Sequence, residues 1–285
     1  MGVFLVDVAR YEFLQHALVA GVLAGIACGI VGTWVVTRRI TYLAGGIAHA
    51  VLGGVGVARY FQKVHGLEWL NPLYGALAAA LGSALLIGWV SLKAREREDT
   101  LISAMWAVGM AVGLVFITRT PGYGEDLMSY LFGNILLVGK SDLLLLAGLD
   151  AAVLLVVIGY YNRLAAVSFD PQFAGLRGVN TAFFHLLLLC VVALSVVLLI
   201  SVVGIVLVIA LLAIPAAIAG KFTHRLWSMM VLASVLGVVF TTGGLAVSYA
   251  PGLPAGATTI LLAAGAYLLF QLPTVIRSRA NRNRD

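Results

Sequence analysis

Nine long apolar runs, separated by short polar stretches, occupy most of this chain and limit its fold more than any other feature. A helix needs about 20 apolar residues to cross the roughly 30 Å hydrocarbon core of a bilayer. The runs span residues 13–36, 41–61, 72–92, 101–118, 143–160, 182–199, 200–220, 226–248 and 256–275. We therefore predict an all-α integral membrane protein with about nine transmembrane helices.

Composition supports this class. Of the 285 residues, 62% are hydrophobic and 11% are charged, and the mean hydropathy is +1.05, outside the usual range of soluble domains. No polar stretch approaches the roughly 50 residues of a separate domain, so we expect a single transmembrane domain over residues 1–285. The net charge of +6 comes from small basic clusters beside the apolar runs, without the basic stripe that is typical of nucleic-acid binding.

The basic residues between the runs predict the orientation of the chain. Cytoplasmic loops of membrane proteins are enriched in lysine and arginine. Here these residues fall in alternate connections and in the tail at 277–285: Arg38, Arg39, Lys93, Arg95, Arg97, Arg163, Arg177, Lys221, Arg225, Arg277, Arg279, Arg282 and Arg284. We expect the N-terminus outside and the C-terminal tail in the cytoplasm, which requires an odd number of crossings.

Three local features qualify this outline. Gly21, Gly25 and Gly29 repeat every four residues and predict a close contact of the first span with another helix. Pro215 lies inside the seventh span, where the missing amide hydrogen predicts a kink. The segment 127–138 is apolar but too short to cross, so it is either re-entrant, lining the pathway, or an ordinary interfacial helix.

His49 is the first candidate for a functional residue, because ionisable groups inside a membrane are costly and rare. It lies ten residues after Arg39, about 15 Å deep at 1.5 Å per residue. Imidazole is a good ligand for zinc and similar metal ions. With Gly45, Gly46 and Gly53 around it, we expect open space beside the ring, as a wet conduit for an ion requires. A hydrogen-bonded packing role is the alternative.

Asp150 is the second candidate, as the carboxylate in the middle of the fifth span. Beside a histidine of another helix it could complete a metal site or accept a proton. The alternative is a carboxylic acid that burial keeps neutral, or one that is hydrogen-bonded to a neighbouring helix. The residues leave both readings open.

The sequence gives no sign of an ATPase or of another enzyme. Val138 to Ser141 reads VGKS, like the end of a phosphate-binding loop, but the glycine expected five residues before Gly139 is Asn134. There is no HExxH motif and no nucleophile motif with its partners. We expect no catalytic residue and no tightly bound cofactor.

The polar stretch 168–180 predicts a short cytoplasmic helix that could dock into a soluble partner. Asp170 precedes a proline, as at a helix start, Ala174 and Gly175 are small residues in its middle, and Gly178 stands at its end. A simple connecting helix is the alternative.

The chain resembles the zinc/manganese/iron ABC transporter permease family over nearly its whole length. The matching stretches are YEFLQHALVAGVLAGIACGIVGTWVVTRR, IAHAVLGGVGVA, NPLYGAL, EDTLISAMWAVGMAVGL, DLMSYLFGNIL, FDPQFAGLRGV, VVGIVLVIALLAIPAAIAG and TTGGLAVSYAPGLPAGATTIL. Together they are specific, although each alone would be weak.

This resemblance implies a permease of the type II importer class in a bacterial plasma membrane. It implies a homodimer with two cytoplasmic ATPase subunits, which bind ATP, and an extracellular or periplasmic metal-binding protein. The transported ion would be Zn²⁺ or Mn²⁺. The family's coupling helix corresponds to Asp170–Gly178, and its pathway histidine corresponds to His49.

One departure bears on the metal. Many members of the family carry an aspartate one helical turn before this histidine, where the chain has Gly45. Loss of a hard oxygen ligand favours zinc slightly over manganese, and Asp150 could be a substitute for it. The alternative functions are a permease for metal chelates such as siderophores or corrinoids, and a proton-coupled secondary transporter.

Overall fold

The computed structural model describes residues 2–93, 98–121, 133 and 135–282, and it contains helices and no strand over those residues. The helices, in chain order, are α1 (Gly2–Arg10), α2 (Glu12–Thr37), α3 (Thr41–Val64), α4 (Pro72–Lys93), α5 (Glu98–Thr118), the 3₁₀ turn η1 (Ile135–Leu137), α7 (Lys140–Phe169), α8 (Pro171–Leu176), α9 (Thr181–Val203), α10 (Ile205–Phe222), α11 (Leu226–Tyr249) and α12 (Ala255–Arg282).

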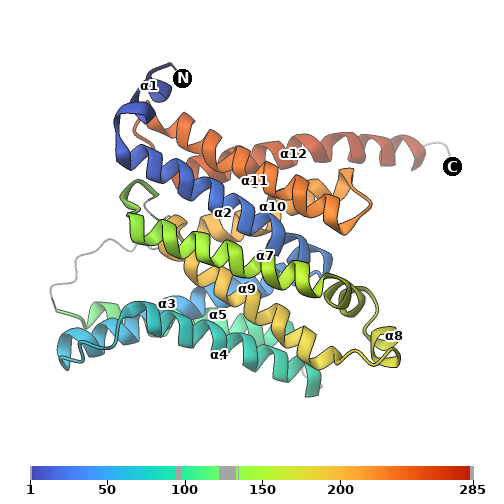
Figure 1. Ribbon diagram of the computed structural model, residues 1–285, viewed down its shortest axis with the longest axis horizontal. Helices are drawn as coiled ribbons and strands as arrows, with labels where there is room; N and C mark the ends of the chain where they lie inside the picture. Colours follow the sequence, from blue (N-terminus) through green and yellow to red (C-terminus); the bar gives the residue numbers. More distant parts are fainter. Residues whose placement is uncertain (1, 94–97, 122–132, 134, 283–285) are drawn as a thin grey trace.

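Eight of the described helices are long and apolar enough to cross a membrane. They are α2 to α5, α7 and α9 to α11, and their positions agree with the first eight predicted runs. The apolar part of α12, Ala255–Gln271, is shorter, but Figure 1 shows this helix alongside α10 and α11, running the length of the bundle. The all-α membrane fold with about nine helices is therefore confirmed.

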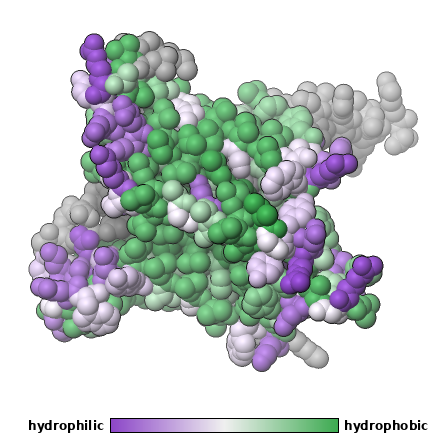
Figure 2. Space-filling view, viewed as in Figure 1, coloured by the Kyte–Doolittle hydropathy of each residue, from purple (hydrophilic) through white to green (hydrophobic). Residues whose placement is uncertain are grey.

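The long helices run back and forth between two ends of the molecule, at the left and right of Figure 1. One end carries the α2–α3 and α10–α11 connections, α8 and the end of α12. We call it the basic end, since its described residues include Arg38, Arg39, Arg177, Lys221 and Arg225. The opposite end carries α1, the α3–α4 and α11–α12 connections and the start of α7. Figure 2 shows a broad hydrophobic band between hydrophilic residues at the two ends.

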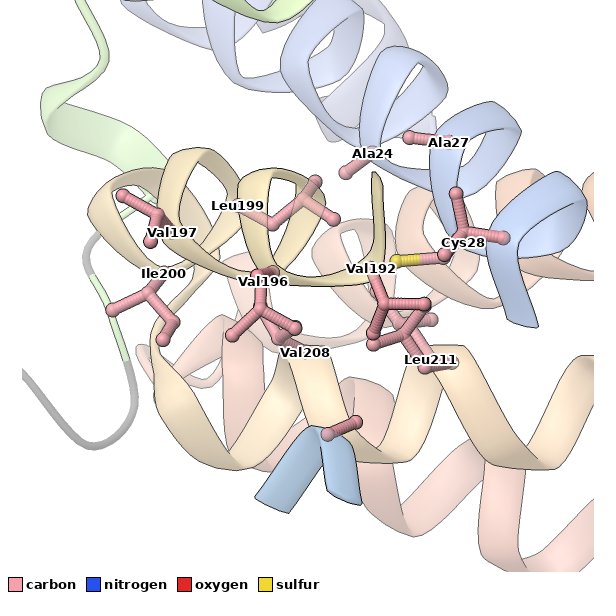
Figure 3. Packing of buried hydrophobic residues seen from close by; sticks show 14 of the residues in the cluster. Ala24, Ala27, Cys28, Val192, Val196, Val197, Leu199, Ile200, Val208 and Leu211 are labelled. Carbon is pink, nitrogen blue, oxygen red and sulfur yellow. The ribbon is translucent and has the colours of Figure 1, made fainter. Parts of the chain in front are cut away.

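The core of the bundle is built around α2 and α9. Their apolar residues face each other directly, and Figure 3 shows Ala24, Ala27 and Cys28 of α2 beside Val192, Val196 and Leu199 of α9, with Val208 and Leu211 of α10 completing the cluster. Helix α9 has no polar face, as expected for a helix surrounded by others. Cys28 is buried as a small apolar residue and forms no disulfide.

Glycines allow α2 and α11 to approach until their backbones touch. On α2, a Cβ atom at Gly25 would lie 2.5 Å from the Val238 nitrogen of α11, and one at Gly29 would overlap the Ser234 backbone. Thr241 of α11 donates a hydrogen bond to the Gly21 carbonyl over 2.8 Å. The predicted close contact along Gly21, Gly25 and Gly29 is confirmed, and α11 is the partner.

The break between the sixth and seventh spans lies at Gly204, not between residues 199 and 200 as predicted. Gly204 has φ 82° and ψ 163°, a conformation for which only glycine is suited, and it alone separates α9 from α10. Part of the segment 127–138 packs against this junction, since Gly133 lies in close contact with the backbone of Val203. Residues 127–132 and 134 lie outside the described residues, so the choice between a re-entrant and an interfacial segment stays open.

Helix α10 continues through the buried Pro215 to Phe222. Proline has no amide hydrogen to donate to the carbonyl four residues earlier, which is that of Leu211. The kink expected there stays a prediction.

Candidate functional site

His49 lies in the third turn of α3 and is buried, with 7% of its surface exposed. Its Nδ1 atom is 2.9 Å from the Gly45 carbonyl oxygen of the same helix. Because a carbonyl only accepts, Nδ1 carries the proton in this contact and Nε2 keeps its lone pair. Nε2 has no hydrogen-bond partner among the described residues, so it is the ring atom available to a metal ion.

The His49 ring stacks on Trp106 of α5, with 4.3 Å between ring centroids and 29° between the ring planes. Tyr42 also contacts the indole, with 5.8 Å between the ring centroids and 36° between the ring planes. The Tyr42 hydroxyl and Ser103 Oγ are hydrogen-bonded at 2.6 Å. Two residues of α3 thus contact one side chain of α5, and the stacking orients the imidazole against the indole.

The open space expected beside His49 at the neighbouring glycines is filled by α5. A Cβ atom at Gly45 would lie 2.8 Å from Trp106 Cζ3, and one at Gly46 would lie 2.7 Å from Ile102 Cγ2. At Gly53 it would lie 2.9 Å from the Gly109 carbonyl oxygen. Within one chain the expected open space is therefore absent at Gly45 and Gly46, where glycine lets α5 pack closely, and the lining of a pathway by these glycines stays a prediction. Gly53 also borders an apolar groove between α4 and α5.

Asp150 lies in α7 and is buried, with 6% of its surface exposed. Neither carboxylate oxygen has a hydrogen-bond partner among the described residues. Helix α7 packs on α2 and α9, and Cys28 of α2 lies within electrostatic range of the carboxyl group. His49 faces α5 instead, so the structure does not bring the two candidate residues together. Among the described residues no three His, Cys, Asp or Glu side chains form a metal-binding group.

The predicted cytoplasmic helix is present as α8, at the basic end of the molecule (Figure 1). Asp170 caps it, since its Oδ1 atom accepts a hydrogen bond from the Phe173 nitrogen over 2.9 Å. Gly178 ends the turn with φ +78°, which favours glycine. Ala174 is buried and seats the helix against the bundle, while Gly175 is exposed.

The exposed apolar side chains of α8 and of the end of α7 were not foreseen from the sequence. Phe169, Phe173 and Leu176 are all exposed, and Leu176 is 87% exposed. Trp106 was not foreseen from the sequence either. The one available signal was a tryptophan in the middle of a span that has one other aromatic residue, Phe116.

The order and packing of these helices agree with known transport proteins. The family model described as "ABC 3 transport family" matches residues 10–273, which is nearly the whole chain. The chain belongs to the ABC 3 transport family. The resemblance noted in the sequence is thereby confirmed.

Relatives of this ABC 3 family chain cover more than nine-tenths of its length. A membrane protein of Synechocystis sp. is 45% identical over 265 residues, which are 93% of this chain and 92% of the relative. The manganese transport system membrane protein MntC of Halalkalibacterium halodurans is 36% identical over 266 residues, which are 93% of this chain and 89% of that protein.

A solved structure shows the same fold. PsaBC from Streptococcus pneumoniae in complex with Fab has a TM-score of 0.83 at 31% identity, and the match covers 94% of each chain. The ABC 3 family chain is thus a multi-pass membrane protein with the fold of an ABC importer permease, and its relatives are membrane subunits of transport systems.

Proposed function

We propose that this chain is the permease subunit of an ATP-driven importer for a divalent transition-metal ion. The observation that carries the proposal is the His49 imidazole, which lies buried in a membrane-crossing helix with Nδ1 bound to a carbonyl and Nε2 unengaged. A hydrogen bond at one ring nitrogen is the usual way in which proteins prepare the other for a metal. The family match and the manganese transporter relative support it.

Manganese is the ion to test first, and zinc is its competitor. The slight preference for zinc rested on the missing carboxylate at position 45, whereas the relative MntC is named for manganese. One imidazole supplies a sparse site, and the remaining ligands would be water, backbone carbonyls or groups of a second permease copy. Weak binding suits a pathway, because an ion held as tightly as in a structural site would not leave it.

The proposed complex contains two copies of this chain, two cytoplasmic ATPase subunits that bind ATP, and a binding protein on the outer side. In this arrangement the basic end faces the cytoplasm and the N-terminus lies outside. The exposed side chains of Phe169, Phe173 and Leu176 suit the surface where an ATPase subunit would dock. ATP-driven closure of those subunits would move α8 and open the pathway toward the cytoplasm.

The test is uptake of radioactive manganese and zinc by cells that lack their own importers and express this chain with its partners. The variant His49→Ala is compared with wild type at equal membrane abundance, and His65→Ala is the matched control. His65 follows α3 and is exposed, with its ring stacked on Phe61 at 5.1 Å.

We expect ATPase-dependent uptake by wild type, a loss of about tenfold or more for His49→Ala, and no loss for His65→Ala. Uptake that survives without the ATPase subunit and collapses with the proton gradient would favour the secondary transporter instead. Competition by metal chelates but not by free ions would favour a chelate permease. If wild type moves neither ion, the metal assignment is wrong.

A further inference from the structure

The turn of α3 that carries His49 offers a metal ion one donor side chain. Helix α3 contains no aspartate, glutamate or cysteine. On a helix, the positions three and four residues away from His49 are the ones that could place a second ligand beside it. One of these positions, four residues before His49, is occupied by Gly45.

The indole of Trp106 closes position 45 to any side chain. A Cβ atom at Gly45 would lie 2.8 Å from Cζ3 and 3.3 Å from Cη2 of this ring. The first distance is shorter than real Cβ atoms show, and a larger side chain would collide further. As long as Trp106 keeps its place, residue 45 has to be glycine.

Trp106 is held in that place from several directions. Its ring contacts both Tyr42 and His49, with centroid distances of 5.8 Å and 4.3 Å. One turn further along α5, a Cβ atom at Gly109 would lie 2.7 Å from the Ala50 Cα atom and 2.8 Å from the His49 carbonyl oxygen. The backbones of α3 and α5 therefore touch beside the site, and α5 cannot rotate the indole away without losing this contact.

We infer that Trp106 is a specificity-determining residue of this transport site, because its indole takes the room of a second ligand at position 45 and holds His49 as the single donor. The inference rests on the proposed function. A site with one imidazole and no carboxylate binds a divalent ion that keeps most of its water ligands, and it gives a hard ion such as Mn²⁺ no protein oxygen on this turn.

The experiment is a double-mutant cycle in the complete importer, with the uptake ratio of manganese to zinc as its readout. The variants are Gly45→Asp, Trp106→Ala and the double variant Gly45→Asp/Trp106→Ala, each compared with wild type at equal folded abundance. Trp89→Ala is the matched control, since this tryptophan is exposed on α4. Trp106→Phe keeps a ring for stacking on His49 and serves where Trp106→Ala does not fold.

Gly45→Asp alone is expected to lose uptake, because its side chain meets the indole. In the double variant the aspartate has room one turn from His49. We expect this variant to recover uptake and to shift the ratio toward manganese by about tenfold, a common size of coupling between contacting residues. Trp106→Phe is expected to keep the wild-type ratio, and Trp89→Ala to change nothing.

The outcomes separate this inference from the proposed function. If wild type transports neither ion, the proposed function is wrong and the inference falls with it. If wild type transports and His49→Ala does not, the proposed importer function is supported, whatever the result for the Trp106 variants. The inference alone is overturned if Gly45→Asp transports normally, or if the folded double variant keeps the wild-type ratio.

Discussion

At the scale of single residues, Asp150 is the least satisfied side chain of a described membrane-crossing helix. It is buried in α7, and neither carboxylate oxygen has a hydrogen-bond partner among the described residues. An unpaired charge in such a place costs several kcal/mol, so the group is stable there only as the neutral acid or with an ion or water. Helix α7 packs on α2 and α9 whereas His49 stacks on α5, so the two side chains do not form one site within a single chain, and a role of Asp150 in transport stays a prediction.

The first prediction compares the two acids of α7. Replacing Asp150 by valine removes an unsatisfied polar group at similar volume, and we expect stability to rise by about 1–3 kcal/mol. Asp142→Ala is the control, and we expect it to lower stability instead. Asp142 Oδ2 accepts a hydrogen bond from the Gly139 nitrogen over 3.0 Å and caps the helix. Loss of this capping hydrogen bond should lower the free energy of unfolding by about 1 kcal/mol.

Thermal unfolding of the purified protein in detergent measures both changes. Manganese uptake by Asp150→Asn, which keeps the shape of the side chain, is expected to stay close to wild type. A folded Asp150→Asn protein that no longer transports would instead restore the reading of Asp150 as an ion ligand or proton acceptor.

At the scale of helices, the contacts of α2 with α11 and of α3 with α5 depend on backbone approach rather than on interdigitated side chains. Lipid chains are as apolar as leucine, so helices in a membrane gain little from burying apolar groups and depend more on close packing. Glycines at the contact make that packing possible. The same contact that stabilises α3 against α5 also places Trp106 on His49.

The second prediction tests the α2–α11 contact. Gly25→Ala puts a Cβ atom 2.5 Å from the Val238 nitrogen, and we expect a loss of about 1–3 kcal/mol in stability or a failure to fold. Gly148→Ala in α7 is the control, since nothing lies within 4 Å of a Cβ atom there. Alanine favours a helix over glycine, so this variant should be neutral or slightly more stable. Fluorescence-detected size-exclusion chromatography after heating compares the melting temperatures of Gly25→Ala and Gly148→Ala. Equal melting temperatures would contradict the packing argument.

At the scale of the whole molecule, all described connections with clustered basic residues lie at one end of the bundle (Figure 1). The hydrophobic band of Figure 2 separates that end from the opposite one. An odd number of crossings follows from the N-terminus and the end of α12 lying at opposite ends. This arrangement leaves α8 at the basic end, where the proposed ATPase subunit would dock.

The third prediction concerns orientation. In a background with Cys28→Ala and Cys190→Ala, single cysteines replace the exposed Glu68, between α3 and α4, or the exposed Gln172 in α8. A thiol reagent that cannot cross membranes is expected to label Glu68→Cys in spheroplasts and to label Gln172→Cys only after the membrane is opened. The reverse labelling pattern would place the basic end outside the cell, and α8 could then not contact a cytoplasmic ATPase subunit.

The sequence by itself determined the membrane class, the spans, the short helix after Asp170 and the candidacy of His49. These properties are local: apolar length, a cap residue or an ionisable group inside an apolar run can be recognised without knowing any neighbour in space. The break at Gly204 was misplaced by a few residues because two apolar helices adjoin there with a single residue between them. The residue types on the two sides of that junction are similarly apolar.

Only the tertiary structure decided what surrounds the candidate residues. The glycines around His49 read equally well as open space or as close packing, and the approach of α5 decided for packing at Gly45, Gly46 and Gly53. The stacking of Trp106 on His49, and the separation of His49 from Asp150, depend on which helices lie side by side. The pairing of helices depends on backbone complementarity between segments that are far apart in the chain, and a local sequence pattern does not reveal it.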